Sequence, residues 1–217
     1  MRGLLQKDLY VMLGQGRTYL VLVAFYLVLT LVGAFDASFF SGFIVLVMTM
    51  LPMSTFTYDD MARWPKFAAA TPAGRRGVVQ GKYLFALCTL AASVVALLVM
   101  DLVYCAGRGG FSQLPDILVA GAACAVVGLF MDLILIPILF KFGSEKGRFV
   151  MMAVWVVIFL LFFGALTLLA ERPGGLSSLP VPRWLLASAP IIALGVLAVA
   201  AVLSYSASLR IFSKKEL

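Results

Sequence analysis

Histidine is absent from the 217-residue sequence, and its absence excludes several kinds of chemistry. A Ser–His or Cys–His catalytic pair, a zinc-binding HExxH helix and a histidine proton relay all need this side chain. Cysteine is scarce: Cys88, Cys105 and Cys124 stand at no metal-ligand spacing, and an odd number cannot form a complete set of disulfides. We expect these thiols to act as small apolar side chains, and we expect no metal site.

Charge is also scarce, since only 12% of the residues are charged and 63% are hydrophobic. A soluble domain usually has about 25% charged and roughly 45–50% apolar residues. The mean hydropathy of +1.08 points the same way. This composition excludes a soluble enzyme, a nucleic-acid-binding protein and a disordered chain, and it predicts an all-α, polytopic membrane protein.

A nucleotide-binding motif of the form GxxxxGK[ST] is missing too. If transport is driven by ATP, another chain must therefore bind ATP and Mg²⁺. We expect this chain to be no enzyme and to hold no cofactor of its own.

Long apolar runs are what the sequence does have. A helix needs about 20 residues to cross a bilayer, and lipid forces such a run to be helical because it offers the backbone no hydrogen bonds. Six runs qualify, within a single transmembrane domain over residues 1–217. The expected spans are residues 18–35, 38–57, 83–106, 117–140, 149–170 and 185–209.

The basic residues are divided unevenly between the segments that join these spans. Of the 17 Lys and Arg residues, only Arg108, Arg172 and Arg183 fall on one side of the membrane. Cytoplasmic loops carry the excess of Lys and Arg, so both termini should be cytoplasmic. The net charge of +7 then reflects topology and attraction to anionic lipid rather than to nucleic acid.

Residues 1–16 are too short and too polar to span. Leu5, Leu9, Met12 and Leu13 fall on one helical face, which favours a helix lying in the inner membrane interface. Glycines at positions 14 and 16 allow a turn into the first span.

Residues 58–82 form a polar loop in which Trp64 and Phe67 lie between charges of both signs. Pro65 suits the first turn of a short helix and Pro72 would end it, which predicts a helix over 65–70. Trp64 and Phe67 could share a face of it, as in a docking surface. A loop whose aromatics sit among lipid head groups is the alternative. The candidate docking residues are Asp59, Asp60, Arg63, Trp64, Pro65, Lys66, Phe67, Arg75 and Arg76.

The second loop on this side, residues 141–148, contains turns at Gly143 and Gly147. Its charged residues Glu145, Lys146 and Arg148 read either as an ordinary helix connection or as a second, smaller contact.

Two acids fall in or near the spans. Asp101 should reach the outer interface and be exposed. Asp132 comes nine residues before Lys141, which places it roughly 13 Å inside the membrane at 1.5 Å per residue. It is a possible intramembrane polar site: either a carboxylate that couples transport to ions, or a protonated or hydrogen-bonded acid at a helix contact.

Three segments in order resemble a known family, the small six-span membrane subunits of bacterial ABC type 2 exporters. They are residues 1–10 (MRGLLQKDLY), residues 58–67 with Thr71-Pro72 and Gly81-Lys82-Tyr83-Leu84, and residues 137–148. Within that family the chain is similar to permeases that export amphipathic peptides such as phenol-soluble modulins. Pro65 departs from the pattern, since a polar helix former is expected there.

The resemblance implies an N-terminal helix on the inner leaflet and a coupling helix at about 65–70 that docks on an ABC ATPase. It also implies two permease copies, identical or paralogous, with two ATPase subunits, in a bacterial plasma membrane. Glu145, Lys146 and Arg148 would make the smaller contact. Two other functions stay open: a secondary transporter with Asp132 as its coupling carboxylate, and a membrane immunity or scaffold protein.

Overall fold

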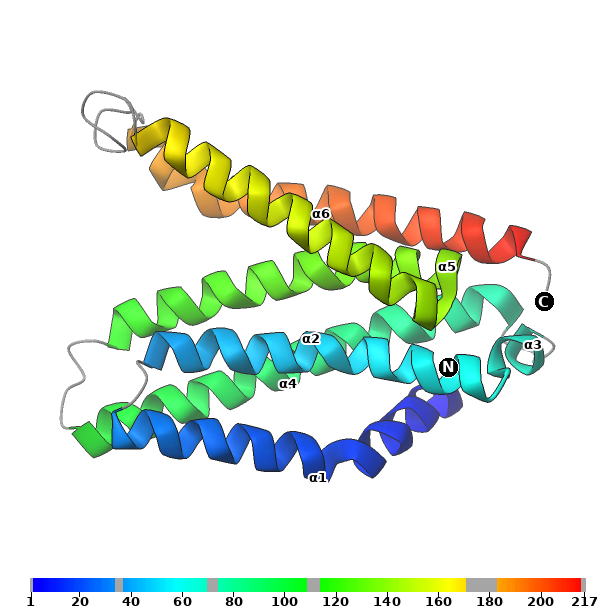
Figure 1. The fold of residues 1–217 in the computed structure, drawn as a ribbon, viewed down its shortest axis with the longest axis horizontal. Coiled ribbons are helices and arrows are strands. Elements are labelled where there is room, and N and C mark those ends of the chain that lie inside the picture. The colour runs from blue at the N-terminus through cyan, green and yellow to red at the C-terminus, as the bar shows by residue number, and fades with distance from the viewer. Residues whose placement is uncertain (1, 34–36, 70–73, 109–113, 171–182, 216–217) are drawn as a thin grey trace.

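The structure is a computed structural model that describes residues 2–33, 37–69, 74–108, 114–170 and 183–215. Within these ranges the chain forms helices and no strand. The helices are α1 (Arg2–Val32), α2 (Ala37–Met61), α3 (Trp64–Ala69), α4 (Gly74–Arg108), α5 (Leu114–Ala170) and α6 (Arg183–Lys214). They run side by side in a bundle, except for the short α3 at one end (Figure 1).

Helix α5 is divided by a sharp fold at Gly143. A straight helix of its 57 residues would be about 85 Å long, far more than the roughly 30 Å hydrocarbon core. Gly143 has φ 76° and ψ 179°, a conformation open to glycine because it has no Cβ. The two arms therefore run in opposite directions (Figure 1). This confirms the turn expected at Gly143, whereas the turn expected at Gly147 was wrong, because Gly147 lies inside the helical second arm.

Helix α1 is bent by 53° between its Gly3–Gly14 and Arg17–Thr30 arms, where the sequence predicts a turn. The short first arm has an unusual orientation. Its apolar Leu9, Tyr10 and Leu13 are exposed, whereas Asp8 is buried against the rest of the chain.

Among the described residues, four helical stretches are long and apolar enough to cross a membrane, or five if the bent α1 counts as one span. They are Gly42–Met61, Gly74–Val103, Leu114–Leu161 and Ile191–Lys214. The third contains the fold at Gly143. The molecule is thus an all-helical membrane protein, and the number of six crossings stays a prediction.

The largest apolar core lies where α2, α4, α5 and α6 meet. It includes Phe56, Val79, Ile136 and Phe212, all nearly inaccessible to solvent. Helices α2 and α5 approach especially closely at Gly128, where an added Cβ would lie 2.5 Å from Cγ1 of Val45. Many other large apolar side chains point outward, as expected for helices in lipid.

Both ends of the described chain, the short α3 and the fold at Gly143 lie at the same end of the bundle (Figure 1). This is the arrangement predicted from the distribution of Lys and Arg. Which side of a membrane this end faces stays a prediction.

Candidate functional site

Helix α3 begins one residue before the predicted helix. A tight turn precedes it: the backbone N–H of Arg63 donates to the carbonyl of Asp60 at 3.1 Å, and Arg63 has φ 50°. This left-handed conformation costs roughly 1–2 kcal/mol for a residue with a Cβ. Pro65 then occupies the first turn, where a missing N–H has no cost. The departure from the family pattern at Pro65 is thus compatible with a helix. The predicted end at residues 70–72 lies outside the described residues.

The two aromatic residues of this helix differ in exposure. Phe67 is 66% exposed, while Trp64 is half-buried with the Lys7 ammonium 4.9 Å from its ring centroid. Ala68 is completely buried. Both residues belong to α3, three positions apart as the prediction requires, but Trp64 packs toward the bundle, as Ala68 does, and Phe67 projects outward. The outward face of α3 carries Lys66 and Phe67, and Arg63 precedes it exposed.

Beneath α3 lies a network of four charged side chains from three helices, Lys7 and Asp8 of α1, Asp59 of α2 and Lys82 of α4. We call it the ionic network. Nζ of Lys82 lies 2.7 Å from Oδ2 of Asp59 and 3.1 Å from Oδ1 of Asp8. Nζ of Lys7 contacts the same two carboxylates, at 3.0 Å from Asp8.

The charges of this network balance, and its centre is buried. The Lys82 side chain is only 4% exposed, and its ammonium also donates to Oγ1 of Thr55 at 3.1 Å and lies over the ring of Phe56. Removing one partner from a buried pair leaves an uncompensated charge and typically costs about 3–5 kcal/mol. The network therefore fixes the short arm of α1 against α2 and α4.

Sequence reasoning missed Lys7, Asp8 and Lys82 as functional candidates. The available signal was weak: Lys7 and Asp8 stand in a segment whose apolar face is separate from them, and Lys82 directly precedes a long apolar run. Nothing local in the sequence connects residues that are 52 and 74 positions apart.

Asp60 joins the end of α2 to the fold in α5. Its Oδ2 accepts a hydrogen bond of 2.6 Å from the backbone N–H of Ser144, the first residue after Gly143. A carboxylate at the start of a helix satisfies a free N–H and interacts favourably with the helix dipole. Asp60 of α2 therefore acts as the N-cap of the second arm of α5.

A groove of about 760 Å³ lies beside this cap. It is bounded by the end of α2, including Met61, and by the fold in α5, including Glu145, Lys146 and Arg148. These last three side chains are exposed. The structure thus brings the two predicted contact regions next to each other.

Two basic side chains near this end bind backbone carbonyls of other helices. The Arg75 guanidinium donates to the carbonyl of Phe212, at 3.2 Å, and to that of Ser213, near the end of α6. Nζ of Lys215 donates to the carbonyl of Phe140, at 3.2 Å, just before the fold in α5. Cations stabilise helix C-termini by satisfying their free carbonyls.

A family model described as an ABC-2 family transporter protein matches residues 3–213. The chain belongs to the ABC-2 transporter family. This membership indicates the permease subunit of an ABC transporter, and it implies an ABC ATPase as a partner in general. Comparisons with curated proteins and with solved structures give no significant match.

The docking residues predicted for this ABC-2 permease fall into two groups. Asp59, Asp60 and Arg75 already bind other parts of the chain, and Trp64 and Pro65 are half-buried. The second group has side chains exposed at the surface, where a partner could contact them: Arg63, Lys66, Phe67 and Arg76. A docking role for any of them stays a prediction.

Away from this end, the permease buries two further acids. Asp101 is 3% exposed, so its predicted exposure was wrong; the side chain turns toward Gly121 of α5, 3.9 Å from where a Cβ would stand, instead of toward the membrane surface. Asp132 is 2% exposed, and its Oδ1 has no hydrogen-bond partner in the described part of the chain. Nowhere in that part do three or more Cys, Asp or Glu side chains gather to hold a metal ion.

Proposed function

We propose that this chain is the permease of an ATP-driven exporter and that α3 is its coupling helix, docking on a separate cytoplasmic ABC ATPase. The observation that carries the proposal is α3 itself: a short helix outside the bundle, with an exposed apolar and basic surface, that stands on a buried ionic network. ATP and Mg²⁺ would bind in the ATPase, and this chain would do no catalysis.

The exposed surface suits a protein partner. Phe67 offers an apolar anchor, and Arg63, Lys66 and Arg76 surround it with positive charge. Interfaces are commonly centred on an aromatic or arginine anchor, and complementary charge guides the encounter. The ATPase should therefore present an apolar pocket with an acidic rim, and Glu145, Lys146 and Arg148 would add a second, smaller contact.

The buried contacts give a route for motion from α3 to the bundle. The Lys7 ammonium lies against the ring of Trp64 and also binds Asp59 of α2. Asp60, near the end of α2, caps the second arm of α5. A push on α3 would thus reach α1, α2, α4 and α5 through paired charges and hydrogen bonds. ATP can drive transport only if the ATP-bound partner prefers one permease conformation over another.

The topology we propose has six crossings: the long arm of α1, α2, α4, both arms of α5, and α6. The end that carries α3 and both termini would face the cytoplasm of a bacterium, as the positive-inside rule predicts. The short arm of α1 would lie on the inner leaflet, with Leu9, Tyr10 and Leu13 in lipid and Asp8 turned inward.

Two copies of this chain, or this chain and a paralogue, would form the path together with two ATPase subunits. Amphipathic peptides are the cargo that the resemblance favours. The wide apolar outer surfaces of the helices suit a path formed between two permeases.

The test is co-purification from the native membrane in mild detergent, followed by ATPase assays on the reconstituted complex. We expect a Walker-motif ATPase to come with the chain at about one per permease. Phe67→Ala combined with Lys66→Glu should release it, because this pair removes the anchor and reverses a charge.

Phe25→Ala is the matched control, since Phe25 is similarly exposed but lies in the long arm of α1. It should leave ATPase binding unchanged. If no ATPase is recovered from wild-type membranes, or if the Phe67 and Lys66 variant binds it normally, α3 is not the coupling helix.

The unpartnered oxygen of Asp132 favours a second candidate, a secondary transporter with this acid as its coupling group. That function predicts transport driven by an ion gradient without ATP and abolished by Asp132→Asn. A membrane immunity or scaffold protein would instead protect cells without any ATPase and tolerate every change in α3.

A further inference from the structure

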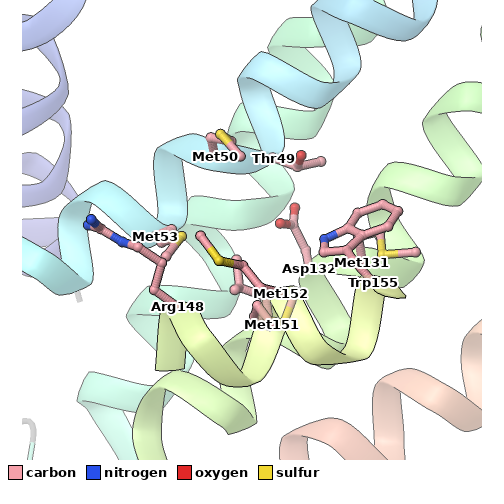
Figure 2. Close-up of a pocket in the computed structure, with 10 residues that line it drawn as sticks. Thr49, Met50, Met53, Met131, Asp132, Arg148, Met151, Met152 and Trp155 are labelled. Carbon is pink, nitrogen blue, oxygen red and sulfur yellow. The ribbon is translucent and has the colours of Figure 1, made fainter. Parts of the chain in front are cut away.

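The carboxylate of Asp132 faces a pocket of about 290 Å³ between α2 and the two arms of α5 (Figure 2). Its walls are almost entirely apolar. Five methionines and one tryptophan supply most of them: Met50, Met53, Met131, Met151, Met152 and Trp155.

Asp132 lacks the lysine partners that the buried acids of the ionic network, Asp8 and Asp59, have. Its side chain is almost wholly inaccessible, and Oδ1 makes no hydrogen bond with any described residue. An unpaired polar atom in an apolar environment is costly, and in membranes such acids usually face a partner or a ligand path. The pocket is therefore lined by a buried carboxylate, one oxygen of which has no hydrogen-bond partner among the described residues.

The nearest basic residue of the pocket does not use that acceptor. Arg148 lines the cavity, but Figure 2 shows its guanidinium directed away from Asp132, past Met53. The carboxylate is thus left facing the cavity, and the positive charge stands at its outer edge.

The walls favour an organic rather than an inorganic cation. Methionine side chains are flexible and polarizable, so they adapt to apolar bodies of different shape. The indole of Trp155 is the aromatic ring best suited to attract a cation. A metal ion would need several oxygen, nitrogen or sulfur ligands in fixed geometry, whereas here one carboxylate stands among thioethers.

From these observations we propose that the pocket binds a lipophilic organic cation, with its ammonium group on the carboxylate of Asp132 and its apolar body among the methionines and Trp155. The volume fits a compact ligand, near the lower limit of about 300 Å³ for small-molecule sites. All residues of the site belong to this chain, and binding there does not require the ATPase. The proposal of this site can therefore be tested separately from the proposal that α3 is the coupling helix.

The experiment measures equilibrium binding of radiolabelled 4-phenylbutylamine to the full chain in lipid nanodiscs, with 4-phenylbutanol as a neutral probe of the same apolar shape. We expect the amine to bind wild type at least ten times more tightly than the alcohol. Asp132→Asn should weaken amine binding at least ten-fold and leave alcohol binding within two-fold, because only the charge is removed.

Asp101→Asn is the matched control, since Asp101 is equally buried in another span and should not affect amine binding. Met152→Trp is an independent variant, because Met152 is more than half exposed and a larger side chain there fills the cavity without unpacking the core. It should also weaken binding of the amine. Thermal unfolding of each variant in nanodiscs checks that it is folded.

Three results would overturn the proposal. The first is equal binding of amine and alcohol to wild type, which makes the pocket a lipid-filled gap. The second is undiminished amine binding by folded Asp132→Asn, and the third is the same loss in Asp101→Asn.

Discussion

Asp59 and Asp132 are both buried acids, and the molecule treats them in opposite ways. Asp59 accepts two ammonium groups, and its network has as many positive as negative members. Asp132 has an oxygen with no partner and faces a cavity walled by methionines. The comparison separates a buried charge that holds helices together from one that is available to a ligand.

Removing Lys82 should disrupt the ion pairs of Asp59 and have the largest effect on stability of the changes considered. Lys82→Met leaves Asp8 and Asp59 with only Lys7, and we expect a loss of about 3–5 kcal/mol in stability. The measurement is thermal unfolding and the yield of folded protein in detergent. The matched control, Lys214→Met, changes an exposed lysine at the same end and should be nearly neutral.

The double variant Lys82→Met with Asp59→Leu sharpens this test. It removes one charge of each sign and leaves the Lys7–Asp8 pair, so part of the lost stability should return. A double variant less stable than Lys82→Met alone would show that the network acts through something other than charge balance.

Asp60→Ala should have an intermediate effect, because it removes a cap rather than a paired charge. We expect a loss of about 1 kcal/mol, the usual value for an N-cap. Faster hydrogen exchange at the Ser144 amide would locate the loss in the fold of α5. Glu145→Ala, one residue further along and exposed, should leave that amide protected; similar exchange in both variants would contradict the assigned cap.

Asp132→Asn should have the smallest effect on stability. Because Oδ1 has no partner, an isosteric neutral side chain removes no hydrogen bond of that oxygen, and we expect a change within about 0.5 kcal/mol in unfolding experiments. Asp59→Asn, the same substitution at the paired acid, should cost several times more. Equal losses at the two positions would erase the distinction between them.

Local pattern was enough to predict much of this fold. Long apolar runs predict the membrane helices, Gly143 predicts the fold in α5, and Pro65 places α3 within one residue. The spacing from Lys141 predicts that Asp132 lies deep inside the membrane. Each of these inferences uses residues close together in the sequence, where period and turn chemistry carry the information.

The contacts of the site could not be predicted in that way. Asp60 and Ser144 are 84 positions apart, and Arg75 and Phe212 are 137 apart. A polar loop between spans looks solvated until the packing of the helices is known, so Asp59 and Arg75 were predicted at the surface. Asp101 was misplaced for a related reason, because its depth was judged from its own helix without the neighbouring α5.

The ionic network also constrains the order in which the chain can assemble as it is made. Lys7 and Asp8 emerge first, and Asp59 follows after the next two apolar segments, which leaves two carboxylates for one lysine. The set is balanced only when Lys82 emerges, directly before the apolar part of α4. The N-terminal arm can thus settle into its final place only after more than a third of the chain has been synthesised, and the cap of α5 by Asp60 must wait longer still.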